Sequence, residues 1–430
     1  MSAIRHQPAL YKIVVSHYLV AALFFLALTI MFMFSINEIA GHYFQPRILA
    51  LTHTAALGWG TLIIFGALYQ LLPVILETPL YSLRLCWASF ILLVPGIMML
   101  ICAFWFFDPG LMMQVAGIFV LSGILLFNLN VLLTLKNKQQ TTIFQEFIVT
   151  SCMWLALTAV LGLLLVFNFR FSFLPKDHLD FLRLHAHMGI AGWFLMLIVG
   201  VSGKLIPMFL VSKYQQTGLL SYAYYLINAA LLLFLIDGYF YGINFKTNLI
   251  LLIGVAGICT YLFYVYRCFV SRIRKDVDLA MVQTLFSFVL LAASIGVLPF
   301  IFHYHLKQNP LATNLSVIYG ILIFIGWISA LILGQTFKTL PFIVWVKHYE
   351  HLTGKVKTPM PADLNSNFLL AIQCMAFMLF LITFISGFIF SSWMMKYVGA
   401  SCLVITALCY CFHISHLLLH KTRIQHYDQI

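Results

Sequence analysis

The sequence predicts an all-α polytopic membrane protein with twelve transmembrane helices. Composition is the first observation behind this fold class. Only 8% of the 430 residues are charged, whereas a soluble domain has about 25%. Apolar residues make up 63% of the chain, and the mean hydropathy is +1.01. A soluble globule of this size would lack the polar residues needed to cover its surface, so a cytosolic enzyme, a disordered chain and a secreted disulfide scaffold are excluded.

Long apolar stretches are the second observation. A helix needs roughly 20 mostly apolar residues to cross a bilayer. The strands of a membrane barrel would be about ten residues long and alternate in polarity, so helices are the better prediction. The predicted spans are residues 13–36, 49–75, 85–107, 111–135, 146–169, 184–211, 219–241, 248–270, 279–302, 313–337, 366–390 and 395–418.

The distribution of basic residues predicts the orientation of the spans. Of the 24 Lys and Arg residues, about fifteen fall at one set of span ends and about seven at the other. We therefore expect both termini in the cytoplasm, in the inner membrane of a bacterium. The net charge of +12 is explained by basic residues beside anionic lipid, so the expected partner is the bilayer and not a nucleic acid.

A repeated motif is the third observation. A Gly-Trp pair occurs in spans 2, 6 and 10, and in each copy a Gly follows the Trp by seven residues and a Pro follows that Gly by seven. The two intervals between the Trp residues are both 134 residues. The copies are Gly58-Trp59 with Gly66 and Pro73, Gly192-Trp193 with Gly200 and Pro207, and Gly326-Trp327 with Gly334 and Pro341. This spacing predicts one transmembrane domain built from three four-helix repeats, at about 1–138, 139–275 and 276–430.

The Gly and Trp residues of the motif have two interpretations. A glycine lets another helix, or a flat ligand, approach the backbone closely. Gly58 and Gly192 would make this room, and Trp59 and Trp193 would pack against a neighbouring helix or against a cofactor. Packing between helices alone also explains these residue types.

Three histidines are the candidate ligands. His53 and His187 occupy the same repeat position, six residues before the Trp, and His185 lies two residues before His187. An ionisable residue inside a span is costly and is therefore a functional candidate. Residues i and i+2 on a helix point about 200° apart, so His185 and His187 are poorly placed to bind one metal ion together. They would ligate separate planar cofactors, or one would ligate while the other forms a hydrogen bond.

Neutral imidazole is a common axial ligand of haem iron. Two histidines on facing helices would give a six-coordinate haem, and the glycines would leave room for the macrocycle. The sequence thus predicts one or two haems, with His53, His185 and His187 as the candidate axial ligands.

Other histidines form weaker candidates for metal ligands. His413 and His416 are three residues apart near the end of span 12 and share a helical face, which would suit a transition metal. An interfacial polar stripe is the alternative. His303 and His305 follow span 9 and either reach a cofactor near the outer leaflet or lie at the membrane surface.

The segment from His185 to Pro207 resembles span 10 of the catalytic subunit (subunit I) of cbb3-type haem–copper oxidases. That family has the pattern H-x-H-x4-G-W-x6-G-x6-P, which residues His185, His187, Gly192, Trp193, Gly200 and Pro207 match. The resemblance implies twelve core spans with pseudo-threefold symmetry. It also implies that His187 holds a low-spin haem, that His185 holds the high-spin haem, and that His53 is the span-2 ligand, so that His53 and His187 clamp one b-type haem.

The chain also departs from this family. Tyr319 and Ile321 stand in span 10 where the two histidines would be, and span 7 contains no His. The resemblance therefore indicates a divergent member whose usual copper site is missing, so bound copper is uncertain. The NnrS-type haem proteins of nitric-oxide responses are similar in size and span count.

Three functions remain open from the sequence. The first is a haem protein for electron transfer or for a diatomic gas, oxygen or nitric oxide. A degenerate oxidoreductase that works alongside other respiratory or nitric-oxide-response subunits is one form of this function. The second is a copper or haem transporter, because internal repeats also occur in transporters. The third is a non-catalytic assembly subunit that kept the fold and lost its chemistry, which the absence of His in span 10 favours.

Overall fold

The computed structural model describes residues 8–41, 43–76, 78–136 and 142–422. Within these ranges the regular structure is helical, and twelve helical segments are long and apolar enough to cross a membrane. The predicted all-α fold with twelve spans is therefore confirmed. Nine spans are single helices, namely α1 (Pro8–Phe34), α5 (Leu83–Trp105), α6 (Leu111–Leu135), α7 (Ile143–Phe171), α10 (Gly218–Phe240), α11 (Phe245–Val270), α12 (Leu279–Leu306), α15 (Asn367–Ile389) and α16 (Trp393–Leu418).

Each of the other three spans combines two α-helices with a π-helical segment between them. They are α3 (Pro46–His53), η1 (Thr54–Thr61) and α4 (Leu62–Leu76); α8 (His178–His187), η2 (Met188–Leu195) and α9 (Met196–Phe209); and α13 (Leu311–Ile321), η3 (Leu322–Ile328) and α14 (Ser329–Tyr349). Short helices α2 (Ile36–Ile39), η4 (Glu350–Leu352) and η5 (Pro361–Leu364) lie between spans. The three composite spans are those that carry the Gly-Trp motif.

Polar side chains fix where several spans begin. The first backbone N–H groups of a helix have no partner inside it, and a side-chain oxygen at the N-cap accepts their hydrogen bonds. Thr142, Asn244, Asp278, Ser366 and Ser392 do this for α7, α11, α12, α15 and α16. These caps place the helix starts within a few residues of the predicted positions.

The tenth span differs from its prediction. The apolar stretch ends at residue 337, but α14 continues through Lys338 and Pro341 to Tyr349. Lys338 forms an ion pair with Asp278, which offsets the cost of a cation at this depth. The sequence pattern alone did not indicate this partner 60 residues away.

The chain divides into two compact units that do not follow the predicted repeat boundaries. Unit 1 comprises residues 1–70, 104–106 and 278–430, and unit 2 comprises residues 71–103 and 107–277. The last four spans of the chain lie in unit 1, namely α12, the α13–η3–α14 span, α15 and α16. Most of unit 2 is formed by α5 to α11. Unit 1 thus combines the first two spans with the last four.

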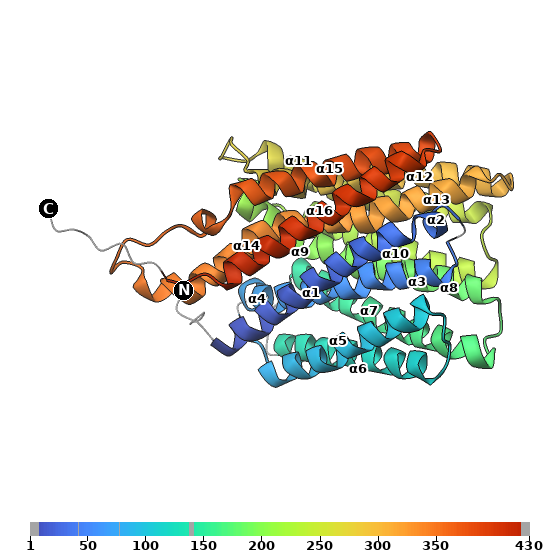
Figure 1. Ribbon diagram of the computed structural model, residues 1–430, viewed down its shortest axis with the longest axis horizontal. Helices are drawn as coiled ribbons and strands as arrows, with labels where there is room; N and C mark the ends of the chain where they lie inside the picture. The colour runs from blue at the N-terminus through green and yellow to red at the C-terminus, as the bar shows by residue number, and fades with distance from the viewer. Residues whose placement is uncertain (1–7, 42, 77, 137–141, 423–430) are drawn as a thin grey trace. The chain divides into compact units, whose positions relative to one another are not determined.

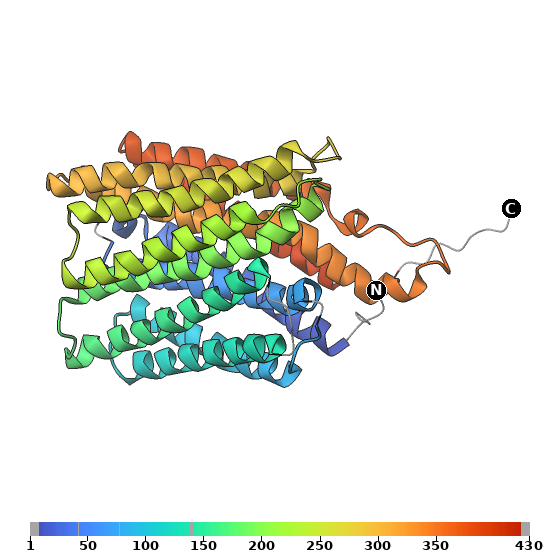
Figure 2. The same cartoon turned by 180° about the vertical axis from the view of Figure 1, so that it is seen from behind.

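Within unit 1, α15 and α16 form an antiparallel pair, and α1 packs along α16 (Figure 1). Helix α12 packs against η3 and α14. Within unit 2, α6 packs on α7, α7 packs on η2 and α9, and α10 pairs with α11 (Figure 2). Each of the three motif-bearing spans therefore packs against the span that precedes it in the chain, with α1 against η1, α7 against η2 and α12 against η3.

Candidate functional site

The three π-helical segments coincide with the Gly-Trp motif. They begin at Thr54, Met188 and Leu322, so they have the same spacing as the three Trp residues. A π-helix is rare and occurs mostly as a short insertion in an α-helix, often at functional sites. The sequence repeat therefore has a counterpart in local backbone structure that sequence reasoning did not predict.

Two predicted ligands occupy the same position relative to these segments. His53 is the last residue of α3 and His187 is the last residue of α8, each directly before a π-helical segment. Their backbone angles are nearly identical, with φ −73° and ψ −32° for His53 and φ −72° and ψ −33° for His187. In the third copy, Ile321 stands at this position.

The imidazole rings of these two histidines are also held in the same way. The Nδ1 atom of His53 donates a hydrogen bond to the carbonyl oxygen of Leu49 at 2.7 Å, and Nδ1 of His187 donates to that of Arg183 at 2.8 Å. A carbonyl oxygen only accepts, so Nδ1 must carry the hydrogen, and the lone pair of the neutral ring lies on Nε2. Histidines that ligate metals commonly donate their other ring N–H to such an acceptor.

Aromatic side chains pack beside both rings. The His53 ring stacks on Phe104, with centroids 4.7 Å apart and planes 27° apart. The His187 ring lies 4.5 Å from that of Phe234 at an angle of 42°. His53 and Phe104 belong to unit 1, and His187 and Phe234 belong to unit 2.

His185 is held differently from His187. Its Nδ1 atom donates to the carbonyl oxygen of Thr158 on α7 at 3.0 Å, and its ring lies over Gly162 of the same helix. A Cβ atom at Gly162 would lie 2.8 Å from Cε1 of His185. The ring of His185 thus forms its hydrogen bond with α7, whereas that of His187 forms its hydrogen bond within α8, as expected for side chains at positions i and i+2. A hydrogen bond was one of the two roles predicted for His185.

The motif glycines are in contact with protein side chains. A Cβ at Gly58 would lie 2.7 Å from Phe24 on α1, and a Cβ at Gly192 would lie 2.6 Å from Trp154 on α7. The second glycine of each motif is equally close to a side chain. A Cβ at Gly66 would lie 2.5 Å from the Cβ of His17, and a Cβ at Gly200 would lie 2.4 Å from the Cβ of Phe147. Of the two interpretations of these glycines, close packing of helices is the one that this arrangement supports.

Helix α1 crosses the second span, and α7 crosses the sixth span, at residues with matching spacing. His17 and Phe24 are seven residues apart on α1, and Phe147 and Trp154 are seven apart on α7. On the partner spans, Gly66 and Gly58 are eight apart, as are Gly200 and Gly192. In the third pair, α12 contributes Thr284 and Leu290 opposite Gly334 and Gly326. Thr284 and Leu290 are six residues apart, and a Cβ at Gly326 would lie at an ordinary contact distance of 3.6 Å from Leu290. The first two pairs therefore cross closely at both glycines, and the third pair does so only at Gly334.

The motif tryptophans are buried within protein. Trp59 stacks on Phe25, with ring centroids 4.4 Å apart, and its Nε1 donates to Oγ of Ser329 at 3.0 Å. Trp193 lies with its edge toward Phe127. Trp327 is fully buried, and among the described residues its Nε1 has no hydrogen-bond partner. The three rings pack among protein side chains; the predicted packing of Trp59 and Trp193 against a cofactor stays a prediction.

One in-span histidine had no role in the sequence analysis. His17 is fully buried, donates from Nδ1 to the carbonyl oxygen of Ile13 at 2.8 Å, and meets the ring of Tyr69 edge-on. It fills the space left by Gly66. Sequence gives no signal for this, because the pairing depends on how α1 crosses α4.

The weaker candidate ligands do not gather into a larger metal site. His413 is fully buried, whereas His416, one turn later, is exposed. His303 and His305 are both exposed in the last turn of α12. No group of three or more His, Cys, Asp or Glu residues in the described ranges is placed to hold a metal ion. Metal binding by these four residues stays a prediction.

These features define an α-helical integral membrane protein of twelve spans, three of them interrupted by π-helices. Comparison with protein-family models and with curated proteins finds no match for this chain.

Proposed function

We propose that this protein binds b-type haem in the membrane, with His53 and His187 each serving as an axial ligand of haem iron, and that it takes part in electron transfer or in the binding of a diatomic gas. The observation that carries the proposal is the shared geometry of the two histidines. Both precede a π-helix with the same backbone angles, and both donate from Nδ1 to a carbonyl oxygen one turn earlier. This arrangement fixes the tautomer that offers Nε2 to a metal.

The donor set fits haem and not a bare metal ion. A histidine at each position supplies a neutral imidazole, and no group of three or more potential ligands in the described residues would complete a tetrahedral site. When bound, haem would supply one-electron chemistry or an iron site for a gas. The protein's own contribution is to orient the two rings through backbone hydrogen bonds and through the flanking Phe104 and Phe234.

The proposal includes the repeat architecture. We propose three four-helix repeats with pseudo-threefold symmetry, supported by π-helices at equal spacing and by the matching close crossings of α1 and α7 over the motif glycines. In this architecture the third copy has lost its ligand, since Ile321 and Tyr319 replace the two histidines. The usual copper centre of a haem–copper oxidase is therefore not part of the proposal. We also propose that both termini lie in the cytoplasm of a bacterium.

A second candidate is a non-catalytic subunit that kept the fold. The observation in its favour is that Phe24 and Trp154 occupy the space beside Gly58 and Gly192 that a macrocycle would need. Such a protein would be stable without haem and would co-purify with an oxidase.

The test uses purified His53→Ala and His187→Ala proteins with His303→Ala as the matched control, because His303 is exposed at the end of α12. We expect each of the first two variants to contain less bound haem in the pyridine haemochrome assay, and the control to keep it. Haem content unchanged in both ligand variants would contradict the proposal. A stable, haem-free wild-type protein bound to an oxidase would instead support the second candidate.

A further inference from the structure

Four helices of unit 1 contribute buried polar side chains in which one or both of the nitrogen and oxygen atoms have no hydrogen-bond partner among the described residues. These are Gln283 on α12, Gln335 on α14, Gln373 on α15 and His413 on α16. Gln373 and His413 are fully buried, and Gln283 is 6% exposed. Among the described residues, no hydrogen bond reaches Nε2 of Gln283, Oε1 of Gln335, either amide atom of Gln373 or either ring nitrogen of His413.

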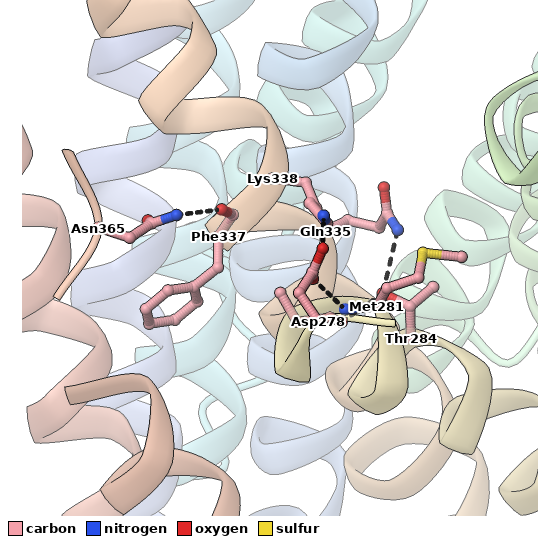
Figure 3. Close-up of polar contacts among 8 residues, drawn as sticks. Asp278, Met281, Thr284, Gln335, Phe337, Lys338 and Asn365 are labelled. Atoms are coloured by element: carbon pink, nitrogen blue, oxygen red, sulfur yellow. Dashed lines mark hydrogen bonds and ion pairs between the residues drawn. The ribbon is translucent and has the colours of Figure 1, made fainter. Parts of the chain in front are cut away.

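Polar contacts bring these helices together at one level. Gln335 donates from Nε2 to Oγ1 of Thr284 at 3.0 Å, which joins α14 to α12 (Figure 3). Gln283 is the neighbour of Thr284, and its Oε1 accepts a hydrogen bond from Sγ of Cys374 at 3.4 Å, which joins α12 to α15. In Figure 3 the side-chain oxygen of Gln335 points away from Thr284.

Contacts with α16 complete the set. Thr336, the neighbour of Gln335, forms a hydrogen bond of 3.0 Å with the hydroxyl of Tyr410. His413, one turn after Tyr410, stacks on Phe337, with ring centroids 3.7 Å apart and planes 13° apart. The four side chains that carry unpartnered atoms therefore belong to residues at, or next to, the contacts that join α12, α14, α15 and α16.

The register of the last two helices places Gln373 in the same group. Gly387 packs on Lys396, and Gly399 packs on Phe384. Counting from these contacts along two antiparallel helices puts Gln373 level with Tyr410, because both helices rise about 1.5 Å per residue.

A dry interior would make this arrangement expensive. Each buried polar group left unpaired lowers the stability of the folded protein, and inside a bilayer no external solvent offsets that loss. The unpartnered amide atoms are two donors and two acceptors, and the imidazole of His413 can both donate and accept a hydrogen bond. The nearest described ion pair, Asp278 with Lys338, is neutral overall. A ligand with both donors and acceptors and no charge fits this set.

We propose that Gln283, Gln335, Gln373 and His413 hold a cluster of ordered water molecules inside unit 1. A buried water typically makes about three hydrogen bonds to otherwise unpaired polar groups, and water is small enough to bridge side chains from four packed helices. The site is separate from the proposed haem ligands and does not depend on them.

The test is radiolytic footprinting of the purified full-length protein, in which X-rays generate hydroxyl radicals from water itself. Side chains beside ordered internal water are oxidised even when buried. Phe337 is compared with Phe380 and Phe384, which are equally buried but pack among phenylalanines. We expect early oxidation of Phe337, His413 and Cys374 and protection of Phe380 and Phe384. Equal protection of all five would overturn the proposal.

A variant gives an independent check. Gln373→Leu removes both amide atoms at little change in volume. If the wild-type protein holds water here, we expect oxidation of Phe337 and His413 in the variant to fall to the level of Phe384. We also expect the melting temperature of the variant to drop, because the remaining polar groups lose the waters that they shared with Gln373. A higher melting temperature than wild type would overturn the proposal, since replacing a dry unpaired amide by an apolar group is stabilising. If the variant does not fold, footprinting of the wild-type protein still decides.

Discussion

The Nδ1 atom of His187 lies 2.8 Å from the carbonyl oxygen of Arg183, one helical turn earlier. His53 repeats this contact with Leu49 at 2.7 Å. In both cases the next residue begins a π-helix. The shared geometry is the basis of the proposed haem ligation, and the helix crossings around it lead to further predictions.

Gly200 tests the close crossing of α7 over α9. A Cβ added to Gly200 would overlap the Cβ of Phe147, which belongs to the rigid part of that side chain. We expect Gly200→Ala to destabilise the protein by about 1–3 kcal/mol, the range for overpacking, in thermal unfolding of the detergent-solubilised protein. Gly296→Ala is the control, because nothing lies within 4 Å of that position, and it should be neutral or slightly stabilising. Equal melting temperatures of the two variants would contradict the crossing.

The hydrogen bond of Trp59 to Ser329 predicts a difference between two buried tryptophans. Trp59→Phe removes a donor that is satisfied at 3.0 Å, and we expect a loss of about 1 kcal/mol beyond the packing change. Trp327→Phe removes an Nε1 that has no partner among the described residues, so it should cost less. The measurement is the unfolding midpoint of both variants, and a larger loss for Trp327→Phe would be inconsistent with this hydrogen bond.

Asp278 has two separable roles at the start of α12. Its Oδ1 atom accepts from the backbone N–H of Met281 at 3.0 Å, and its Oδ2 atom pairs with Lys338 (Figure 3). Asp278→Asn keeps a capping oxygen and removes the charge, so we expect a loss of about 1 kcal/mol or less for this partly exposed pair. Asp278→Ala also removes the cap and should cost about 1 kcal/mol more. Equal unfolding midpoints for the two variants would show that the cap contributes nothing.

The orientation is tested by labelling from one side of the membrane. Lys307 and Lys355 are both exposed, at opposite ends of the tenth span. In a background without the native cysteines, we expect a membrane-impermeant maleimide added to intact spheroplasts to label Lys307→Cys and to spare Lys355→Cys. The reverse pattern would invert the proposed topology.

Sequence predicted most of the fold because burial in a bilayer is governed by apolar length. The twelve spans follow from this rule, with most ends shifted by only a few residues. The rule failed at α14, because the neutralisation of Lys338 depends on Asp278, which is distant in the chain. The π-helices were also missed, since the local sequence Thr54–Thr61 gives no pattern that separates a π-helix from an α-helix.

Sequence identified the candidate histidines but not the side chains that pack around them. Repeat spacing singled out His53 and His187, and the structure gives them a common local geometry. Spacing did not reveal which residue fills the space beside each glycine. That choice, Phe24 for Gly58 and Trp154 for Gly192, depends on helix crossings that are set by packing and not by local pattern.

The most direct test of the central claim is the optical spectrum of the purified wild-type protein, recorded with its iron content. The account predicts a Soret band with the reduced bands of a b-type haem, and iron in at least equimolar amount. A protein purified after expression with an adequate haem supply that shows no Soret band and no iron would contradict it.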